Sequence, residues 1–431
     1  MNKYVIIVHM QRFKIVILAL CSFTMVFSLV AQEELLYEDH IYLEHIKSVQ
    51  LSHQGLSTSL PLVDLGSSAK LKLSFDDILG GDREYTYRLI HCDKDWQPSE
   101  LDESQYLDGF NDEEIRDYEY SIGTRIDFTN YTLELPNNDV NWRISGNFLL
   151  VVRDNDSDEL AFSRRFMVAE KQVVVNVDIK RALLASKSLT HQELIIAINN
   201  RNFPVSNPQR EIFVTAIQNG RWDIAQENII PQFVIGDQIE FNRAKRISFP
   251  AFNEFRGVDI RSLRSRGFGV RNIEVKEDGI RMIVEKDRKR QGITYSNVSD
   301  LNGNYIIQSL EYNQDHIRSD YIETSFAIEN RDIILDGDVY LIGKFTDWKP
   351  LEEFRLKYDY DLQLYYGGGL LKQGYYDYQY VVLYDDETYD PSYFEGSNFA
   401  TDNDYVVLVY YRSLTGRYDR LIGVTSLISE F

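Results

Sequence analysis

The stretch EIFVTAIQNGRW, residues 211–222, decides the class of fold. It begins with apolar and β-branched residues, which are typical of a strand, and it ends in Asn219-Gly220. Asn-Gly is a preferred pair for tight hairpin turns, because both residues readily adopt positive φ. The strands before and after such a turn run antiparallel to each other. The stretch therefore predicts a β-hairpin and an antiparallel sheet.

Similar patterns extend outward in both directions. Aromatic residues make up 13% of the chain, with 29 tyrosines against nine prolines, and long helical periodicity is nearly absent. Short alternating runs bounded by Gly, Asp, Asn or Pro predict an all-β protein built from tandem antiparallel sandwiches of immunoglobulin or fibronectin type. In the first block we expect a helical turn within Asp108–Tyr120. The strands expected there are Ile46–Leu51, Lys70–Phe75, Tyr85–Cys92, Thr132–Leu135, Asn147–Arg153 and Ser163–Val168.

The chain divides into four predicted segments. Residues 1–31 form a signal peptide, 32–169 a first sandwich, 170–318 a second that opens with QVVVNVDI, and 319–431 a third and most aromatic sandwich. No low-complexity linker separates the blocks. We therefore expect the three sandwiches to dock side by side.

The signal peptide is predicted from its layout. Arg12 and Lys14 precede an apolar run, Ile15–Val30, with Ala31 at the junction to a polar chain. The run is short for a membrane span, which needs about 20 apolar residues. Acylation at Cys21 is disfavoured, since Leu20 is larger than the residue that such sites prefer. Translation starts at Met1 or Met10, and in either case we expect an exported protein.

The net charge and the cysteine content limit the possible partners and the means by which the exported protein is stabilised. Losing residues 1–31 removes three basic residues and no acid from a chain of net charge −21, which leaves −24. Such a charge repels nucleic acid and anionic lipid, so we expect no nucleic-acid partner. Cys92 then has no partner within the chain, so the exported protein must fold without a disulfide.

The segment YRLIHCDKDWQPSELDESQYLDGF, residues 87–110, concentrates groups capable of chemistry. His91 and Cys92 are neighbours in a predicted strand, where adjacent side chains point to opposite faces, so they are poorly placed to act as base and nucleophile. A zinc site would need further Cys or His ligands at suitable spacing. We therefore interpret the segment as an architectural loop, with Trp96 folding back on the core.

The other motifs do not predict a catalytic or ligand-binding site either. The run DNDSDE, residues 154–159, lacks the Gly and Glu that a calcium loop needs at its sixth and twelfth positions, and is predicted to be a hairpin turn. Phosphate-binding glycine loops and nucleophile elbows are missing. Gly367–Gly369 is predicted to form a turn or bulge. We predict no catalytic, cofactor-binding or metal-ligating residues, no small-molecule substrate and no enzyme activity.

Residues 256–290 are locally basic in this acidic chain. Two readings stay open: a solvated face that balances nearby acids, or a surface that binds an acidic partner. The residues singled out for the second reading are Arg264, Arg266, Arg288 and Arg290.

The third block resembles the early-set sandwich of glycogen-binding modules. VYLIGKFTDW, residues 339–348, and LLKQGYYDYQYVV, residues 370–382, carry the likeness. Trp348 matches the family's first sugar-stacking tryptophan, whereas Glu387 stands at the second and Gln379 replaces a sugar-bonding lysine. The likeness implies an early-set-like fold and leaves a periplasmic carbohydrate-binding protein as the alternative function.

The whole exported chain is similar to the plug protein family of the type IX secretion system in Bacteroidetes, whose N-terminal domain was formerly a domain of unknown function. The segments that carry the resemblance are YTYRLIHCDKDWQPSELDESQYLDGFND, YTLELPNNDVNWRISGNFLLVV, SRRFMVAE and FEGSNFATDNDYVVLVYYR. The resemblance implies a non-catalytic protein at the periplasmic side of the outer membrane that caps the opening of a large translocon barrel. We expect the loop containing Trp96, Tyr106 and Phe110 to face the barrel.

Overall fold

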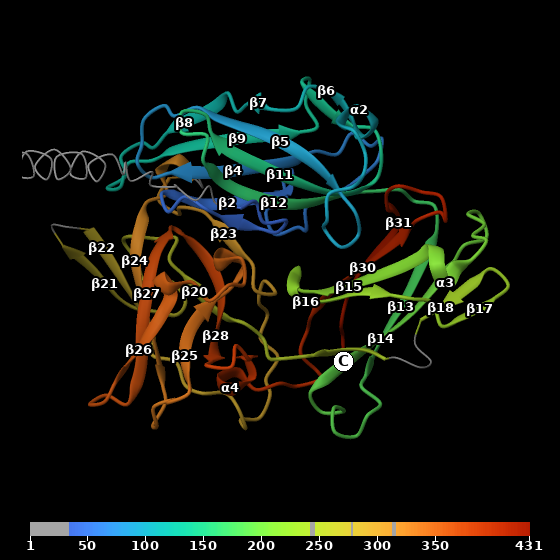
Figure 1. The fold of residues 1–431 in the computed structure, drawn as a ribbon. Helices are drawn as coiled ribbons and strands as arrows, with labels where there is room; N and C mark the ends of the chain where they lie inside the picture. Colours follow the sequence, from blue (N-terminus) through green and yellow to red (C-terminus); the bar gives the residue numbers. More distant parts are fainter. Residues whose placement is uncertain (1–33, 242–245, 277–278, 313–315) are drawn as a thin grey trace, which may run out of the picture. The chain divides into compact units, whose positions relative to one another are not determined.

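The computed structural model describes residues 34–241, 246–276, 279–312 and 316–431, so the predicted signal peptide lies outside the described residues. Nearly all regular structure is β, in mainly antiparallel sheets that pack as sandwiches, which confirms the predicted fold class (Figure 1). Within the described ranges no helix has the length and apolarity needed to cross a membrane. The short helical turns are α2 (Glu103–Tyr106), α3 (Pro208–Glu211), α4 (Ser392–Glu395), η1 (His316–Arg318), η2 (Lys344–Thr346) and η3 (Glu352–Phe354).

The first sandwich packs two sheets around an apolar core in which Phe75 stacks on Tyr131 at 5.1 Å between ring centres. The first sheet runs in the order β1 (His40–Ile41), β12 (Leu160–Ala169), β11 (Gly146–Asp154), β5 (Tyr85–Cys92) and β7 (Glu113–Glu114), with β3 (Leu62–Asp64) parallel to β12. The second runs β2 (Ile46–His53), β4 (Leu71–Asp77), β9 (Thr129–Leu135) and β8 (Asp117–Tyr120), and β6 (Leu107–Gly109) pairs with β10 (Val140–Trp142).

The expected strands of this block are all present, with ends shifted by a few residues. The helical turn predicted within Asp108–Tyr120 is wrong: that segment holds the short strands β6 to β8, and the turn is α2, just before it. The run at residues 154–159 is a hairpin turn between β11 and β12, as predicted. Its first carboxylate, on Asp154, accepts the backbone N–H groups of Asp156 and Ser157 and so closes the turn.

The second sandwich contains the hairpin predicted from the Asn-Gly pair. Asn219 and Gly220 have φ of 52° and 66° and connect β15 to β16. One sheet runs β16 (Arg221–Ile229), β15 (Ile212–Gln218), β30 (Asp404–Tyr411) and β31 (Arg420–Ile428). The other runs β13 (Val174–Arg181), β14 (His191–Asn199), β18 (Gln238–Glu240) and β17 (Phe233–Ile235), with β19 (Ile247–Pro250) beside β14.

The third sandwich is formed by one long, folded-over sheet around an aromatic core. The strands of this sheet follow in the order β20 (Arg256–Asp259), β28 (Gly374–Tyr384), β25 (Gly337–Ile342), β26 (Arg355–Asp359), β27 (Leu364–Lys372), β24 (Tyr321–Glu329), β22 (Gly279–Val284) and β21 (Val270–Lys276). Two further short strands pair with β28, namely β23 (Tyr305–Ile307) and β29 (Tyr389–Asp390). Gly367–Gly369, predicted to form a turn or bulge, lies inside β27. A Cβ on Gly368 would stand 1.9 Å from the carbonyl oxygen of Thr324, so glycine permits this close strand pairing.

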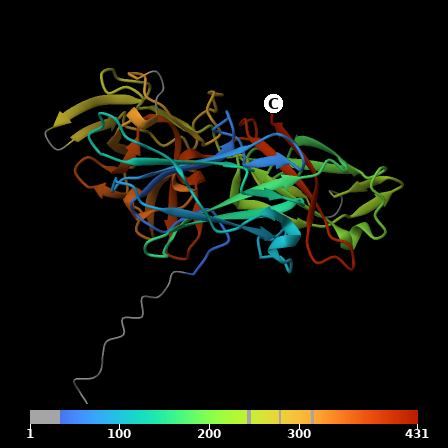
Figure 2. The same ribbon diagram turned by 90° about the horizontal axis from the view of Figure 1, so that it is seen from above.

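The sheets do not follow the boundary predicted between residues 318 and 319. Strands β20 to β23 precede that boundary but belong to the third sandwich, whereas β30 and β31 come from the end of the chain and complete the second. In both views the red strands β30 and β31 run with the green strands β15 and β16 (Figure 1; Figure 2). The register pairs Ile212 with Tyr411 and Gln218 with Tyr405. The third sandwich is therefore inserted into the second, which ties the two together covalently at two points.

Candidate functional site: the junctions between sandwiches and the exposed loops

The loop after β5 docks the first sandwich onto the second. Trp96 is 2% exposed and meets the ring of Trp222 edge-to-face, with 5.0 Å between ring centres. The guanidinium of Arg165 lies 4.5 Å from the Trp96 ring centre and 5.3 Å from that of Trp222, a cation–π contact with both rings. The architectural role predicted for this loop therefore corresponds to a specific contact, the anchoring of one sandwich on its neighbour.

Charged groups of the same loop reinforce the docking. Asp93 accepts a hydrogen bond from Nη2 of Arg412 at 3.0 Å and another from the backbone N–H of Asp419 at 3.1 Å. Asp419 in turn accepts the backbone N–H of Lys94 at 3.0 Å. Charge-assisted hydrogen bonds are stronger than neutral ones. The hydrogen bonds of Asp93 and Asp419 therefore fix the position of the loop on the second sandwich.

His91 and Cys92 lack the ionisation that catalysis would need. Burial lowers the pKa of His91 to about 4, and its Nδ1 lies 2.9 Å from the hydroxyl of Ser99. Burial also raises the pKa of Cys92 to about 12. At neutral pH the imidazole is thus a poor base and the thiol stays protonated, so the pair is suited to packing. Among the described residues, no group of three or more His, Cys, Asp or Glu side chains is placed to hold a metal ion.

The predicted partner-binding loop is only partly available to a partner. Trp96 and Tyr106 are buried, and the Tyr106 hydroxyl donates to the carbonyl of Leu89 at 3.4 Å. The structure therefore corrects the expectation for these two residues, because α2 and the docking of the loop turn their rings inward. Phe110 is 77% exposed and remains a candidate contact.

The four arginines proposed for partner binding separate into two kinds. Arg290 donates to the buried carboxylate of Glu395 at 2.7 Å and serves the fold. Arg264, Arg266 and Arg288 are exposed. Arg288 lies 3.6 Å from the carboxylate of Glu329 but keeps 82% of its side chain accessible. The exposed subset is therefore smaller than the sequence suggested: Arg264 and Arg266 lie on the loop after β20, and Arg288 follows β22.

Trp348, the predicted sugar-stacking residue, is packed inside the protein. It is 5% exposed, with the guanidinium of Arg221 4.7 Å from its ring centre and the ring of Phe255 at 5.7 Å. A Cβ on Gly303 would lie 2.1 Å from the indole, so the ring is enclosed on that side as well. Positive φ at Asp347 and Trp348 turns the side chain inward. The structure thus corrects this assignment, because a buried ring offers no face to a sugar.

The first and third sandwiches meet around a buried ion pair that sequence reasoning missed. Nζ of Lys372, which is 1% exposed, lies 2.5 Å from a carboxylate oxygen of fully buried Asp76. The Tyr321 hydroxyl donates to the same carboxylate at 2.6 Å, and the amide of Asn130 donates at 2.7 Å. Lys372 also lies 3.9 Å from the ring centre of Phe128. The pair is therefore well satisfied by hydrogen bonds, the condition under which a buried pair is tolerated.

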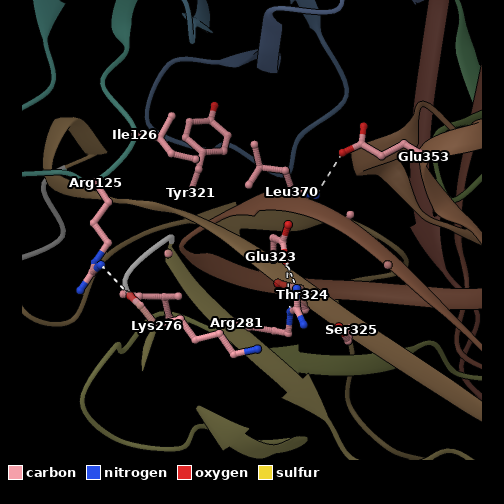
Figure 3. Close-up of a pocket in the computed structure, with 14 residues that line it drawn as sticks. Arg125, Ile126, Lys276, Arg281, Tyr321, Glu323, Thr324, Ser325, Glu353 and Leu370 are labelled. Atoms are coloured by element: carbon pink, nitrogen blue, oxygen red, sulfur yellow. Dashed lines mark hydrogen bonds and ion pairs between the residues drawn. The ribbon is translucent and has the colours of Figure 1, made fainter. Parts of the chain in front are cut away.

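A cavity of about 590 Å³ lies beside this junction, between the Arg125–Ile126 segment and the strands β22, β24 and β27 (Figure 3). Its charged side chains are largely engaged: Arg125 donates to the carbonyl of Lys276, and Arg281 contacts Glu323 at 2.6 Å. Glu353 accepts the backbone N–H of Leu370 at 3.0 Å. The described lining residues include no histidine or cysteine.

Asp377 is a buried carboxyl near the contact of the second and third sandwiches. Its Oδ2 accepts the backbone N–H groups of Leu301 and Gly303 at 2.5 and 3.1 Å, whereas Oδ1 has no hydrogen-bond partner among the described residues. Burial, followed by repulsion from Asp300, raises its pKa from 3.8 to about 7. The folded protein therefore binds a proton at this site more tightly than the unfolded chain does.

This proton makes stability depend on pH. Between about pH 4 and pH 7 the unfolded chain gives up the proton first, so stability falls as the pH rises through that window. We expect Asp377→Asn to make the free energy of unfolding depend less on pH. Between pH 5 and pH 8 the wild type should lose about 2.6 kcal/mol more than the variant, at about 1.4 kcal/mol per pKa unit. Urea unfolding across this range tests the expectation, with the exposed Asp361→Asn as control. Parallel wild-type and Asp377→Asn profiles would contradict it.

The comparisons with known proteins agree with this architecture. A crystal structure of a hypothetical protein from Parabacteroides merdae ATCC 43184 is 31% identical, has a TM-score of 0.87, and covers 92% of this chain and 100% of its own. No curated protein matches. Latent PorU from Porphyromonas gingivalis is 12% identical over 90% of this chain and 34% of its own. Its TM-score of 0.15 is too low to indicate a shared fold.

Taken together, the docked sandwiches, the buried tryptophans and the engaged charged groups define an all-β protein of three packed sandwiches. Residues 46–170 match the model of the type 9 secretion system plug protein 1st domain. This part of the chain is therefore a type 9 secretion system plug protein 1st domain. The match of this domain supports a role in type 9 secretion in the cell envelope, with protein partners in that system.

Proposed function

We propose that the protein, exported by the signal peptide of residues 1–31, caps the periplasmic opening of the outer-membrane translocon barrel of the type 9 system. It acts there without catalysis, held to the inner side of the outer membrane through the barrel. A barrel wide enough to pass folded cargo leaks solutes unless one opening is covered. A cover must be stiff and must bind over more than a crystal-contact area.

The observation that carries the proposal is the locking of the sandwiches to one another. The first is held to the third by the buried Lys372–Asp76 pair and to the second by the Trp96–Trp222 contact. The second and third are joined by two chain crossings and by Arg221, which is 1% exposed and stacks on Trp348. Small interdomain interfaces allow relative motion, whereas these buried contacts oppose it, as a lid requires.

The proposed contact surface includes Phe110 and the exposed arginines. Arg264, Arg266 and Arg288 are exposed basic side chains on a protein of strongly negative net charge, and they suit an acidic rim or partner. Phe110 adds a large apolar ring of the kind that anchors protein interfaces.

Deleting the gene in a strain that also lacks the barrel's other gating partners is expected to make the outer membrane permeable to large solutes. The uptake of a fluorescent dextran measures this. Restoring the wild-type gene should restore the barrier, and the double variant Arg264→Glu with Arg266→Glu should restore less of it, because reversed charges repel an acidic rim.

The matched control is Arg201→Glu with Arg210→Glu, two exposed arginines of the second sandwich that change the net charge by the same amount. Permeability that stays at the wild-type level after deletion would overturn capping. Full restoration by the Arg264/Arg266 variant would show that these two arginines lie outside the contact surface, and it would not contradict the capping proposal.

A further inference from the structure

The sheet β2–β4–β9 of the first sandwich has a polar outer face, which the third sandwich covers. Along β4, whose sequence is LKLSFDD, residues of the apolar core alternate with Lys72, Ser74 and Asp76, which therefore lie on the outer face. The third sandwich meets this face at Asp76, whose carboxylate is bound by Lys372 and Tyr321. Polar side chains that would usually meet water are thus enclosed between two sandwiches.

A cavity of about 240 Å³ remains between the two sandwiches over this polar face. Strands β2, β4 and β9 line it from the first sandwich, and Ile307, His316 and Lys372 line it from the third. The charged side chains among the described lining residues are Lys72, Lys372 and Asp76. Because Lys372 and Asp76 already form an ion pair, the charge of Lys72 is left unbalanced within the cavity.

Lys72 is half-buried, and its ammonium forms no ion pair or hydrogen bond with any residue that the structure describes. Glu134 is its neighbour across the ladder on β9, but that carboxylate is engaged by Lys70 at 2.9 Å and by the amide of Gln54. The chain has a net charge of −21, so a shortage of carboxylates does not explain the unpaired lysine. A partly buried charge is costly without a counter-charge, and an anion in the cavity would supply one.

Two hydroxyl groups beside Lys72 complete a set of hydrogen-bond donors. Ser52 lies directly opposite Lys72 in the β2–β4 ladder and is 7% exposed, and its hydroxyl has no hydrogen-bond partner in the described ranges. Ser74 accepts the amide of Asn130 at 3.0 Å, and its own hydroxyl proton goes to no described residue. Directly opposed residues have Cβ atoms about 5 Å apart, so one bound anion can contact Lys72 and Ser52 together.

We propose that this cavity binds a small organic carboxylate. The ammonium of Lys72 supplies the counter-charge, and the hydroxyls of Ser52 and Ser74 donate to the two carboxylate oxygens. Leu56 and Ile307, which also line the cavity, contact the hydrocarbon part of the ligand. One unbalanced positive charge matches a singly charged ligand, and a planar carboxylate offers an acceptor to each hydroxyl. The site stands independently of barrel capping.

Acetate is the probe, titrated calorimetrically at pH 7 into the protein without residues 1–31, with chloride keeping the ionic strength constant. We expect one acetate to bind per chain. Lys72→Met should weaken binding about tenfold, the loss of one charge-assisted hydrogen bond, whereas Lys72→Arg should retain it. Lys357→Met, at an exposed lysine of strand β26, is the matched control and should bind as the wild type does. Urea unfolding without acetate checks that each variant folds.

Three results would overturn the proposal. The first is the absence of saturable acetate binding to the wild type, which would leave the cavity to water. The second is equal binding by the wild type and a folded Lys72→Met variant, which would place acetate elsewhere on the protein. The third is tighter binding of inorganic phosphate than of acetate, with the same dependence on Lys72, which would assign the cavity to phosphate groups.

Discussion

Replacing Asp76 with asparagine is expected to lower the free energy of unfolding by about 3–5 kcal/mol, the usual cost of leaving one partner of a buried ion pair without its counter-charge. Asparagine preserves the size of the side chain, so the loss reports on charge. The ammonium of Lys372, 1% exposed, would remain at the junction without the carboxylate of Asp76. Urea unfolding at pH 7 measures the change, and small-angle scattering reports whether the first and third sandwiches separate.

The matched control is Glu134→Gln, which removes the carboxylate from an exposed pair with Lys70 at 2.9 Å. Exposed pairs contribute about 0–1 kcal/mol, so this variant should stay close to the wild type. Adding Lys372→Met to Asp76→Asn should recover much of the loss, since both charges of this pair are then removed. Equal effects of Asp76→Asn and Glu134→Gln would show that the buried pair does not hold the junction.

The strands could be predicted from the sequence because their signals are local. Alternation and turn residues located β2, β4, β5, β9, β11 and β12, and Asn219-Gly220 located the β15–β16 hairpin. Strand partners were not predictable in this way. Strand β15 pairs with β30, almost 200 residues later, and an alternating strand carries no mark of its distant partner. The insertion of the third sandwich into the second was therefore missed.

The same reason explains the errors at the candidate site. Trp96 and Trp348 have the residue type and loop setting of surface-binding residues, and only tertiary packing shows that each ring stacks against an arginine from elsewhere in the chain. The sequence placed Arg264 and Arg290 in one basic stretch, but Glu395, which pairs with Arg290, lies 105 residues away. The segment matched by the family, residues 46–170, was recognisable because a run of specific residues carries it.

Replacing Trp348 with alanine is expected to destabilise the protein by about 3–5 kcal/mol, the range for removing a large buried aromatic side chain. The loss combines the cavity left by the indole with the loss of the cation–π contact to Arg221, whose guanidinium is 4.7 Å from the ring centre. The urea midpoint of unfolding measures this change. Because the ring joins the second and third sandwiches, we also expect faster proteolysis at the segments between them.

The same variant separates docking from sugar binding. If Trp348 serves the junction, titration with soluble α-glucans gives no binding for either the wild type or Trp348→Ala, and only stability changes. Tyr360→Ala, which removes a 73% exposed ring from the same sandwich, is the control and should shift stability by no more than about 0.5 kcal/mol. Glucan binding by the wild type that disappears in Trp348→Ala, at unchanged stability, would instead require the indole to leave its packing against Phe255 and Arg221 and would restore the carbohydrate-binding alternative.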